Sequence, residues 1–276
     1  MSKDILVLGG TAVGLLGINA LLQSASAFSF QQYGSTPRWV HWATRDYISR
    51  YGSYLTKDII DYPELYTPQI ELDLGYTIFP VPRGKMDLVL DPASQGGART
   101  GTTFGPYGVS ISPDSVYNIF NGIQGFYYKI LSLHETVNVW TGVLARNWPW
   151  ADGSQLWKTS SPFPNMCDIV MTSELGLVDI SQAQSQRMLN DSGVQLLYGL
   201  QSTYGWTPYR TLFSLTNQYH ISDWHIYDEP LRTAVICLFM SSGAGTNLLT
   251  TFQEVVDVTD LAFFQAQALF PDVKFK

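Results

Sequence analysis

The sequence predicts an α+β fold, in which a small N-terminal β-sheet packs on a mainly helical C-terminal half and an apolar helix precedes both. Three observations lead to this fold class. Short apolar runs bounded by Gly and Pro occur before residue 113 and have the length of strands. After residue 113, apolar side chains recur at helical spacing and almost no strand pattern appears. Residues 5–22 form an uncharged, apolar stretch at the start of the chain.

These changes in pattern divide the chain into three parts. Residues 1–27 are an apolar anchor or signal-like helix, residues 28–112 a helix with a small β-sheet, and residues 113–276 a helical subdomain. A chain of 276 residues has room for one domain or for two closely packed subdomains.

The apolar stretch at residues 5–22 has three interpretations. With Ala25-Ser26-Ala27 after it, it has the order of a signal peptide. Its length is at the short end of what spans a bilayer, which makes a membrane anchor the second interpretation. The Gly9-Gly10-Thr11 turn is a weak match to a nucleotide-binding loop, because no acidic residue follows at the ribose position. We expect a retained helix that contacts the membrane, with the rest of the chain exported.

The N-terminal half alternates between strand and turn signals. Its expected elements, in order, are a linker or extended arm at 28–37, a helix at 38–55, a strand at 70–79, a strand at 85–90, a glycine-rich loop at 95–108 and a short strand at 109–112. The C-terminal half is predicted to be helical. Its expected helices cover 115–145 with a break near Gly122 and Gly125, then 164–175, 180–204, 207–219, 229–240 and 247–256.

The composition limits the classes of partner that the protein can bind. Charged residues make up 14% of the chain and the formal net charge is −7, with no basic stripe that could hold phosphates, so nucleic acid is excluded as a partner. The low charge and the 14% aromatic content suit an extracytoplasmic or surface-assembled protein. Cys167 and Cys237 either form one disulfide bridge outside the cell or are two buried thiols.

The segment YYKILSLHETVNVWTG at residues 127–142 contains the candidate catalytic and metal-binding residues His134, Glu135 and Asn138. On a helix, His134 and Asn138 lie four residues apart on one face, with Glu135 beside them. In the H-E-x-x-H motif of zinc proteases, two histidines bind the metal and the glutamate activates a water molecule. Here Asn138 stands at the position of the second histidine.

Several stretches around this helix resemble the gluzincin metallopeptidases, and in particular their enhancin-like, mucin-active branch. The likeness covers about residues 70–256 and rests on five segments: 85–100, 109–112, His134-Glu135, 197–219 and 230–252. The resemblance implies a zincin-like fold and a zinc ion held by His134, by a residue at position 138 and by a glutamate on a later helix, for which Glu174 is the best match. It also implies that Glu135 is the general base. Asn138 departs from the pattern, because an amide is a poor zinc ligand.

Three functions follow from these observations. The first is a pseudo-peptidase without efficient zinc chemistry that serves a structural or surface-binding role in a cell envelope or virion, with a protein or glycan partner or with copies of itself. In that case His134, Glu135, Asn138 and Glu174 form a hydrogen-bonded polar network. The second is an active zinc metallopeptidase on glycoprotein or cell-wall substrates. The third is a carbohydrate-binding protein that uses Trp148 and Trp150. Zinc is the cofactor of the second function, and the altered motif favours a chain without it.

Overall fold

The computed structural model describes residues 29–94, 97–116, 126–144, 162–179, 181–182, 185, 190–220 and 228–276. The expected apolar helix at residues 5–22 and the tryptophans Trp148 and Trp150 lie outside these ranges. Within the ranges, no helix combines the length and the apolar character needed to cross a membrane. The fold is α+β, as predicted, with a mixed five-stranded sheet and a mainly helical C-terminal half.

The sheet has the strand order β1-β2-β3-β5-β4. Its strands are β1 (Phe30–Ser35), β2 (Trp39–Thr44), β3 (Met86–Leu90), β4 (Ala98–Thr102) and β5 (Gly105–Ile111). The strands β2, β3 and β5 run parallel, whereas β1 and β4 are antiparallel edge strands. Every residue of β3 is buried, as expected for a central strand whose two faces are both covered. The strands predicted at 85–90 and 109–112 are confirmed.

Four predictions for the N-terminal half were wrong. The arm at 28–37 contains β1, and the helix predicted at 38–55 is β2 followed by α2 (Arg45–Tyr51). The strand predicted at 70–79 is the end of α3 (Lys57–Leu74), in which Ile70 and Leu74 are buried on one helical face. The glycine-rich loop at 95–108 holds β4 and the start of β5.

The described part of the C-terminal half contains helices and no strand. Its helices are α4 (Phe126–Leu144), α5 (Pro162–Glu174), α7 (Ser192–Tyr204), α8 (Thr207–Gln218), α9 (Glu229–Ala244), α10 (Leu249–Gln253) and α11 (Asp260–Leu269). Side-chain caps fix three of their starts, because Asp191, Asp228 and Thr259 each accept a hydrogen bond from a backbone N–H three residues later. The predicted helices agree with these elements at their centres, but the helix predicted at 180–204 was wrong in its start, because α7 begins at Ser192 after the Asp191 cap. The sequence analysis did not anticipate α11.

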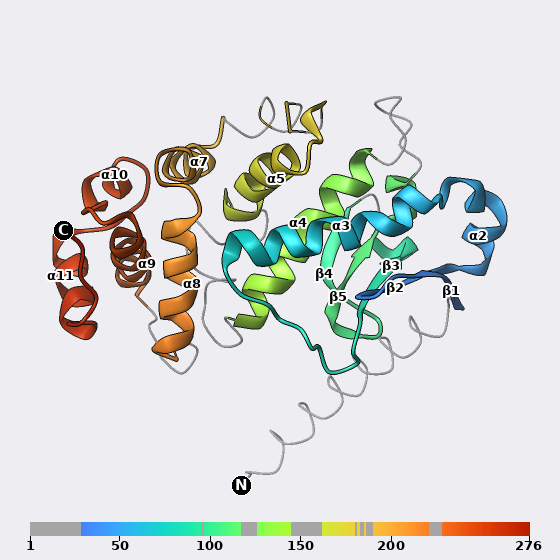
Figure 1. The fold of residues 1–276 in the computed structure, drawn as a ribbon, viewed down its shortest axis with the longest axis horizontal. Coiled ribbons are helices and arrows are strands. Elements are labelled where there is room, and N and C mark those ends of the chain that lie inside the picture. The colour runs from blue at the N-terminus through green and yellow to red at the C-terminus, as the bar shows by residue number, and fades with distance from the viewer. Residues whose placement is uncertain are drawn as a thin grey trace, which may run out of the picture.

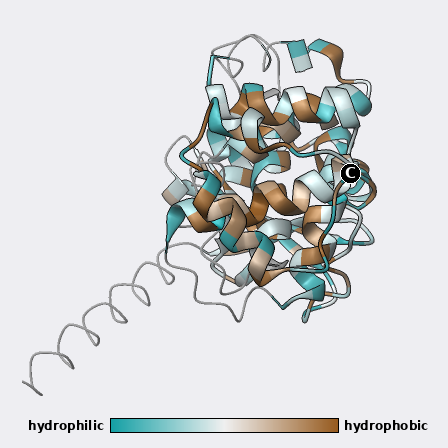
Figure 2. Ribbon diagram, turned by 90° about the vertical axis from the view of Figure 1, so that its left-hand side faces the viewer, coloured by the Kyte–Doolittle hydropathy of each residue, from teal (hydrophilic) through white to brown (hydrophobic). Residues whose placement is uncertain are grey.

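Helices α3 and α4 cover one face of the sheet, and the helices from α5 onward continue away from it toward the C-terminus at the opposite end of the molecule (Figure 1). Trp39 of β2 donates to Thr67 of α3, and Thr100 of β4 donates to Glu135 of α4, so this face of the sheet is the one that carries the helices. One continuous cluster of buried apolar residues runs from Trp39 in the sheet to Val273 near the C-terminus. Figure 2, which views the molecule from the end that carries the C-terminus, shows apolar segments interspersed with polar ones along the ribbon.

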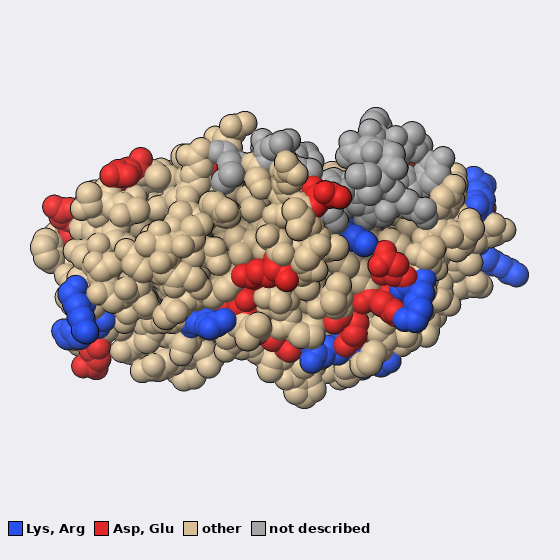
Figure 3. All heavy atoms as spheres, turned by 45° about the horizontal axis from the view of Figure 1, so that its top comes forward, with Lys and Arg blue, Asp and Glu red and all other residues tan. Residues whose placement is uncertain are grey.

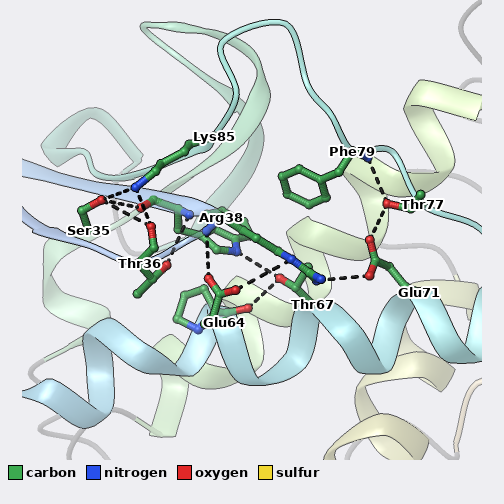
Figure 4. A network of polar contacts seen from close by, with 11 residues as sticks. Ser35, Thr36, Arg38, Glu64, Thr67, Glu71, Thr77, Phe79 and Lys85 are labelled. Carbon is green, nitrogen blue, oxygen red and sulfur yellow. Dashed lines mark hydrogen bonds and ion pairs between the residues drawn. The ribbon is translucent and has the colours of Figure 1, made fainter.

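Polar contacts fix the sheet to α3 at its edge (Figure 4). The Arg38 guanidinium lies 3.1 Å from the Glu71 carboxylate, and the Arg38 backbone N–H donates to Glu64 at 3.0 Å. The same guanidinium lies 5.5 Å from the centre of the Phe79 ring. Lys85 donates to the Ser35 hydroxyl at 2.8 Å, which closes the start of β3 onto the β1–β2 turn. Arg38 therefore connects β2, α3 and the chain that leads to β3.

The two cysteines are free and buried. Of the two alternatives from the sequence, two buried thiols are therefore confirmed. Charged side chains are sparse on the face drawn in Figure 3, and acidic and basic groups lie among wide uncharged areas, which agrees with the low charged fraction of the sequence.

Candidate functional site

The HETVN segment lies in the middle of α4, between the sheet on one side and α5 on the other. His134 is mostly buried, with 12% of its side chain exposed. Its Nδ1 lies 2.8 Å from Oδ2 of Asp168, a fully buried residue of α5. A carboxylate at Nδ1 fixes the ring orientation and places the proton on that nitrogen, which leaves Nε2 as the acceptor. Among the described residues, Nε2 has no hydrogen-bond partner.

Burial and charge shift the pKa values of His134 and Asp168 in opposite directions. Burial alone would lower the pKa of His134, but the charge and hydrogen bond of Asp168 outweigh it, so the pKa is raised above its ordinary value of 6.5. Burial raises the pKa of Asp168 to about 6, and the neighbouring His134 limits that rise. Oδ1 of Asp168 is buried and has no hydrogen-bond partner within the described part of the chain. The pKa values of both partners are therefore raised, and the pair lies in a site that is almost closed to solvent.

Glu135 faces the edge strand of the sheet. Its Oε2 accepts a hydrogen bond from the Thr100 hydroxyl of β4 at 2.7 Å and from the Asn138 amide at 3.4 Å. Asn138 therefore uses its amide nitrogen to hold the Glu135 carboxylate. These contacts join α4 to β4 and leave Glu135 beside His134 but turned to a different partner.

Glu174 belongs to another cluster, at the end of α5. Its Oε1 accepts from the Trp206 indole at 2.9 Å, and its Oε2 accepts from the Gln69 amide at 3.0 Å. The same amide nitrogen of Gln69 donates to Asp73 at 2.9 Å. Burial, reinforced by the hydrogen bond with Glu174, raises the pKa of Asp73 to about 8. No contact among the described residues joins Glu174 to His134.

These contacts determine how well the predicted zinc ligands fit a metal ion. His134 offers one ring nitrogen, Asn138 donates to Glu135, and Glu174 is held by Trp206 and Gln69. In the described ranges, no three His, Cys, Asp or Glu side chains are grouped so that they could hold a metal ion. Zinc in structural and catalytic sites takes three or four nitrogen, sulfur or carboxylate ligands. The described donor set therefore does not fit zinc as it stands.

Asp168 is the residue that sequence reasoning missed. It precedes Glu174 by six residues, and the comparison with the zinc-protease pattern directed attention to the glutamate. The signal was present in the segment NMCDIVM, where a single carboxylate stands among apolar residues of a helix. An acidic side chain is seldom fully buried unless it is paired, so that position called for a partner on a neighbouring helix.

No protein-family model, curated protein or solved structure matches this chain.

Proposed function

We propose that this chain is a zincin-like domain without peptidase activity, which serves a structural or surface-binding role outside the cytoplasm. The observation that carries the proposal is that His134, Glu135 and Asn138 of the HETVN helix are each held by a hydrogen bond within the protein. His134 is paired with Asp168, and Glu135 is paired with Thr100 and Asn138. Hydrogen-bonded networks of this kind can hold helices and sheets in one arrangement without a metal ion.

The extracytoplasmic location and the membrane anchor rest on residues 5–22 and on the low charge of the chain. The partner is a protein, a glycan or another copy of the chain. The fold supplies a rigid platform for such a role, because α4 is fixed to β4 through Glu135 and to α5 through His134.

Metal analysis of the purified full-length chain tests the proposal. We expect less than stoichiometric zinc after dialysis against zinc-containing buffer, and no hydrolysis of peptide or glycoprotein substrates. Asn138→His is the informative gain-of-function variant, with Asn217→His on α8 as the matched substitution elsewhere. Zinc binding that the wild type lacks and Asn138→His creates would support the proposal. Stoichiometric zinc in the wild type, lost together with peptide hydrolysis in His134→Ala, would refute it.

A metal-dependent hydrolase is the second candidate, and one observation favours it. Histidines that bind metals commonly donate their other ring N–H to a carboxylate, and His134 does so to Asp168. Asp168→Asn separates the two candidates. In a metal-binding protein this change lowers metal affinity by about 10- to 100-fold. In the structural role it changes only the stability of the fold.

A further inference from the structure

The face of the sheet turned away from α3 and α4 carries its own set of polar and aromatic side chains. Trp42 of β2 pairs in register with Val89 of β3, Val89 with Ser110 of β5, and Ser110 with Arg99 of β4. Directly paired residues point to the same side of a sheet. The helices contact the other side, through Trp39 and Thr100. Trp42 and Arg99 therefore belong to the face opposite α3 and α4.

Arg83 is held in place on this face by a buried carboxylate and an aromatic ring. One guanidinium nitrogen, Nη1, lies 2.9 Å from Oδ2 of Asp87, whose side chain is only 6% exposed. The guanidinium carbon lies 5.7 Å from the centre of the Phe104 ring, which is the geometry of a cation–π contact. Arg83 itself is 56% exposed, and its Nε and Nη2 have no hydrogen-bond partner among the described residues. An arginine can bind a carboxylate through two parallel hydrogen bonds from these two nitrogens, which we call the guanidinium fork.

Trp42 and Phe104 lie next to this fork. Their ring centres are 4.7 Å apart, and the Trp42 indole donates to Oδ1 of Asp87 at 2.9 Å. Asp87 therefore fixes both Trp42 and Arg83. Both rings are half-buried, so part of each is open to solvent. A preformed guanidinium fork beside half-exposed aromatic rings can bind a ligand that has one negative group and one apolar face.

We propose that Arg83, Phe104 and Trp42 form a binding site for a sugar unit that carries one carboxylate, such as a hexuronic acid. The fork binds the carboxylate, and the pyranose ring packs on the exposed aromatic surface. The net charge of −7 disfavours a polyanion, so a single acidic sugar fits better than a densely charged polymer. An extended peptide fits less well, because the backbones of β2, β3 and β5 are already paired on both sides. The site shares no residue with the HETVN helix, so this inference is independent of the function proposed above.

Arg99 supplies a matched control on the same face of the sheet. It also is 56% exposed and forms an ion pair, at 2.7 Å, with a carboxylate that is 6% exposed, that of Asp91. It differs from Arg83 in its aromatic surroundings, because no aromatic ring contacts its guanidinium in the described structure, and it lacks the hydrogen bond of Arg83 to the Phe104 carbonyl. Comparison of the two arginines therefore tests the contribution of the Phe104 segment.

Titration of the full-length protein with sodium glucuronate, followed by the indole N–H signal of Trp42 in NMR spectra, tests the proposal. Trp42→Phe assigns that signal. We expect glucuronate to shift it and to bind at least about tenfold more tightly than glucose or acetate, which each supply only half of the ligand. Arg83→Lys keeps the ion pair with Asp87 and removes the fork, so it should weaken glucuronate binding about tenfold. Arg99→Lys should leave the affinity unchanged.

Three outcomes would overturn the proposal. The first is that glucuronate binds no more tightly than glucose or acetate. The second is an equal loss of affinity in Arg83→Lys and Arg99→Lys, which would indicate a general effect of charge. The third is tighter binding of a short glutamate-containing peptide than of glucuronate, which would make the site a peptide site. Circular dichroism of each variant confirms that it is folded, and Trp42→Leu, which retains Arg83, tests the stacking surface if Arg83→Lys does not fold.

Discussion

Lowering the pH from 7 to 5 should destabilise the protein by about 2 kcal/mol through one residue, His41. This residue lies in the middle of β2, is completely buried, and has no hydrogen-bond partner for either ring nitrogen within the described part of the chain. Its ring packs against Tyr33 of β1, with 5.7 Å between the ring centres. Burial lowers the pKa of His41 from 6.5 to about 4, and the carboxylate of Asp61 on α3 only partly opposes that change.

The sign of the effect follows from the two pKa values. Because the folded state holds its proton less tightly than the unfolded chain, the contribution of His41 to stability is intact above pH 6.5 and is lost as the pH falls toward 4. The full difference of about 2.5 pH units corresponds to about 3 kcal/mol, of which about 2 kcal/mol is lost at pH 5. Asp73 and Asp168, whose pKa values are raised, work in the opposite direction. The His41 contribution must therefore be measured as a difference between variants.

Urea unfolding of the wild type and of His41→Phe at pH 7 and pH 5 measures that difference. Phenylalanine keeps a ring against Tyr33 and removes two buried nitrogens that have no described partner, so the variant should be at least as stable as the wild type at pH 7. At pH 5 it should be more stable by an additional 2 kcal/mol or so. If the two proteins lose the same free energy of unfolding between pH 7 and pH 5, His41 does not titrate as its burial implies.

Three further predictions concern other parts of the fold. Because the pKa of Asp73 is raised to about 8, the wild type should lose up to about 2 kcal/mol as the pH rises from 6 to 9, and Asp73→Asn should flatten that loss in thermal melts. Gly243→Ala should lower the free energy of unfolding by about 1–3 kcal/mol, because a Cβ there would lie 2.7 Å from the backbone of Pro208. Gly199→Ala is the control, because its Cβ would meet nothing within 4 Å and should stabilise α7 by up to about 1 kcal/mol. Equal effects of the two variants in urea unfolding would contradict the close packing of α8 and α9. Arg38→Ala should destabilise the protein by about 1–2 kcal/mol in the same assay, and Arg38→Lys should recover less than half of that loss, because lysine cannot hold Glu64 and Glu71 together.

The helices of the C-terminal half could be predicted because their signals are local. Asp228 caps the start of α9, and Gly245 ends it in the left-handed conformation. The start of α7 was the exception, because the Asp191 cap lies inside the helix predicted at 180–204. The strands β3 and β5 were also predictable, since apolar runs of strand length stand between turn residues. In these segments, local sequence and tertiary packing favour the same structure.

The errors arose where tertiary packing decides between two local patterns. In residues 38–55, aromatic and apolar side chains recur at helical spacing, but Trp39, His41 and Ala43 also alternate on one side of a strand that is buried by α3. In α3, Pro63 and Pro68 suggested breaks, yet the helix continues through both. The burial of Tyr62, Tyr66 and Ile70 compensates for the backbone hydrogen bonds that the prolines remove. Neither outcome can be read from the local sequence alone.

The contacts of α4 in the structure change how the asparagine at position 138 is interpreted. In the sequence, the asparagine appeared to be the one residue that separated this chain from a zinc protease. In the structure, its amide donates to Glu135, and the Thr100 hydroxyl donates to the same oxygen. A histidine at position 138 would have to give up or replace that contact, while His134 would still be held by Asp168. Asn138 is thus one part of a hydrogen-bonded network that fixes α4 to both of its neighbours, β4 and α5. Loss of one member would leave its partner unpaired, so the network contributes to the stability of the fold.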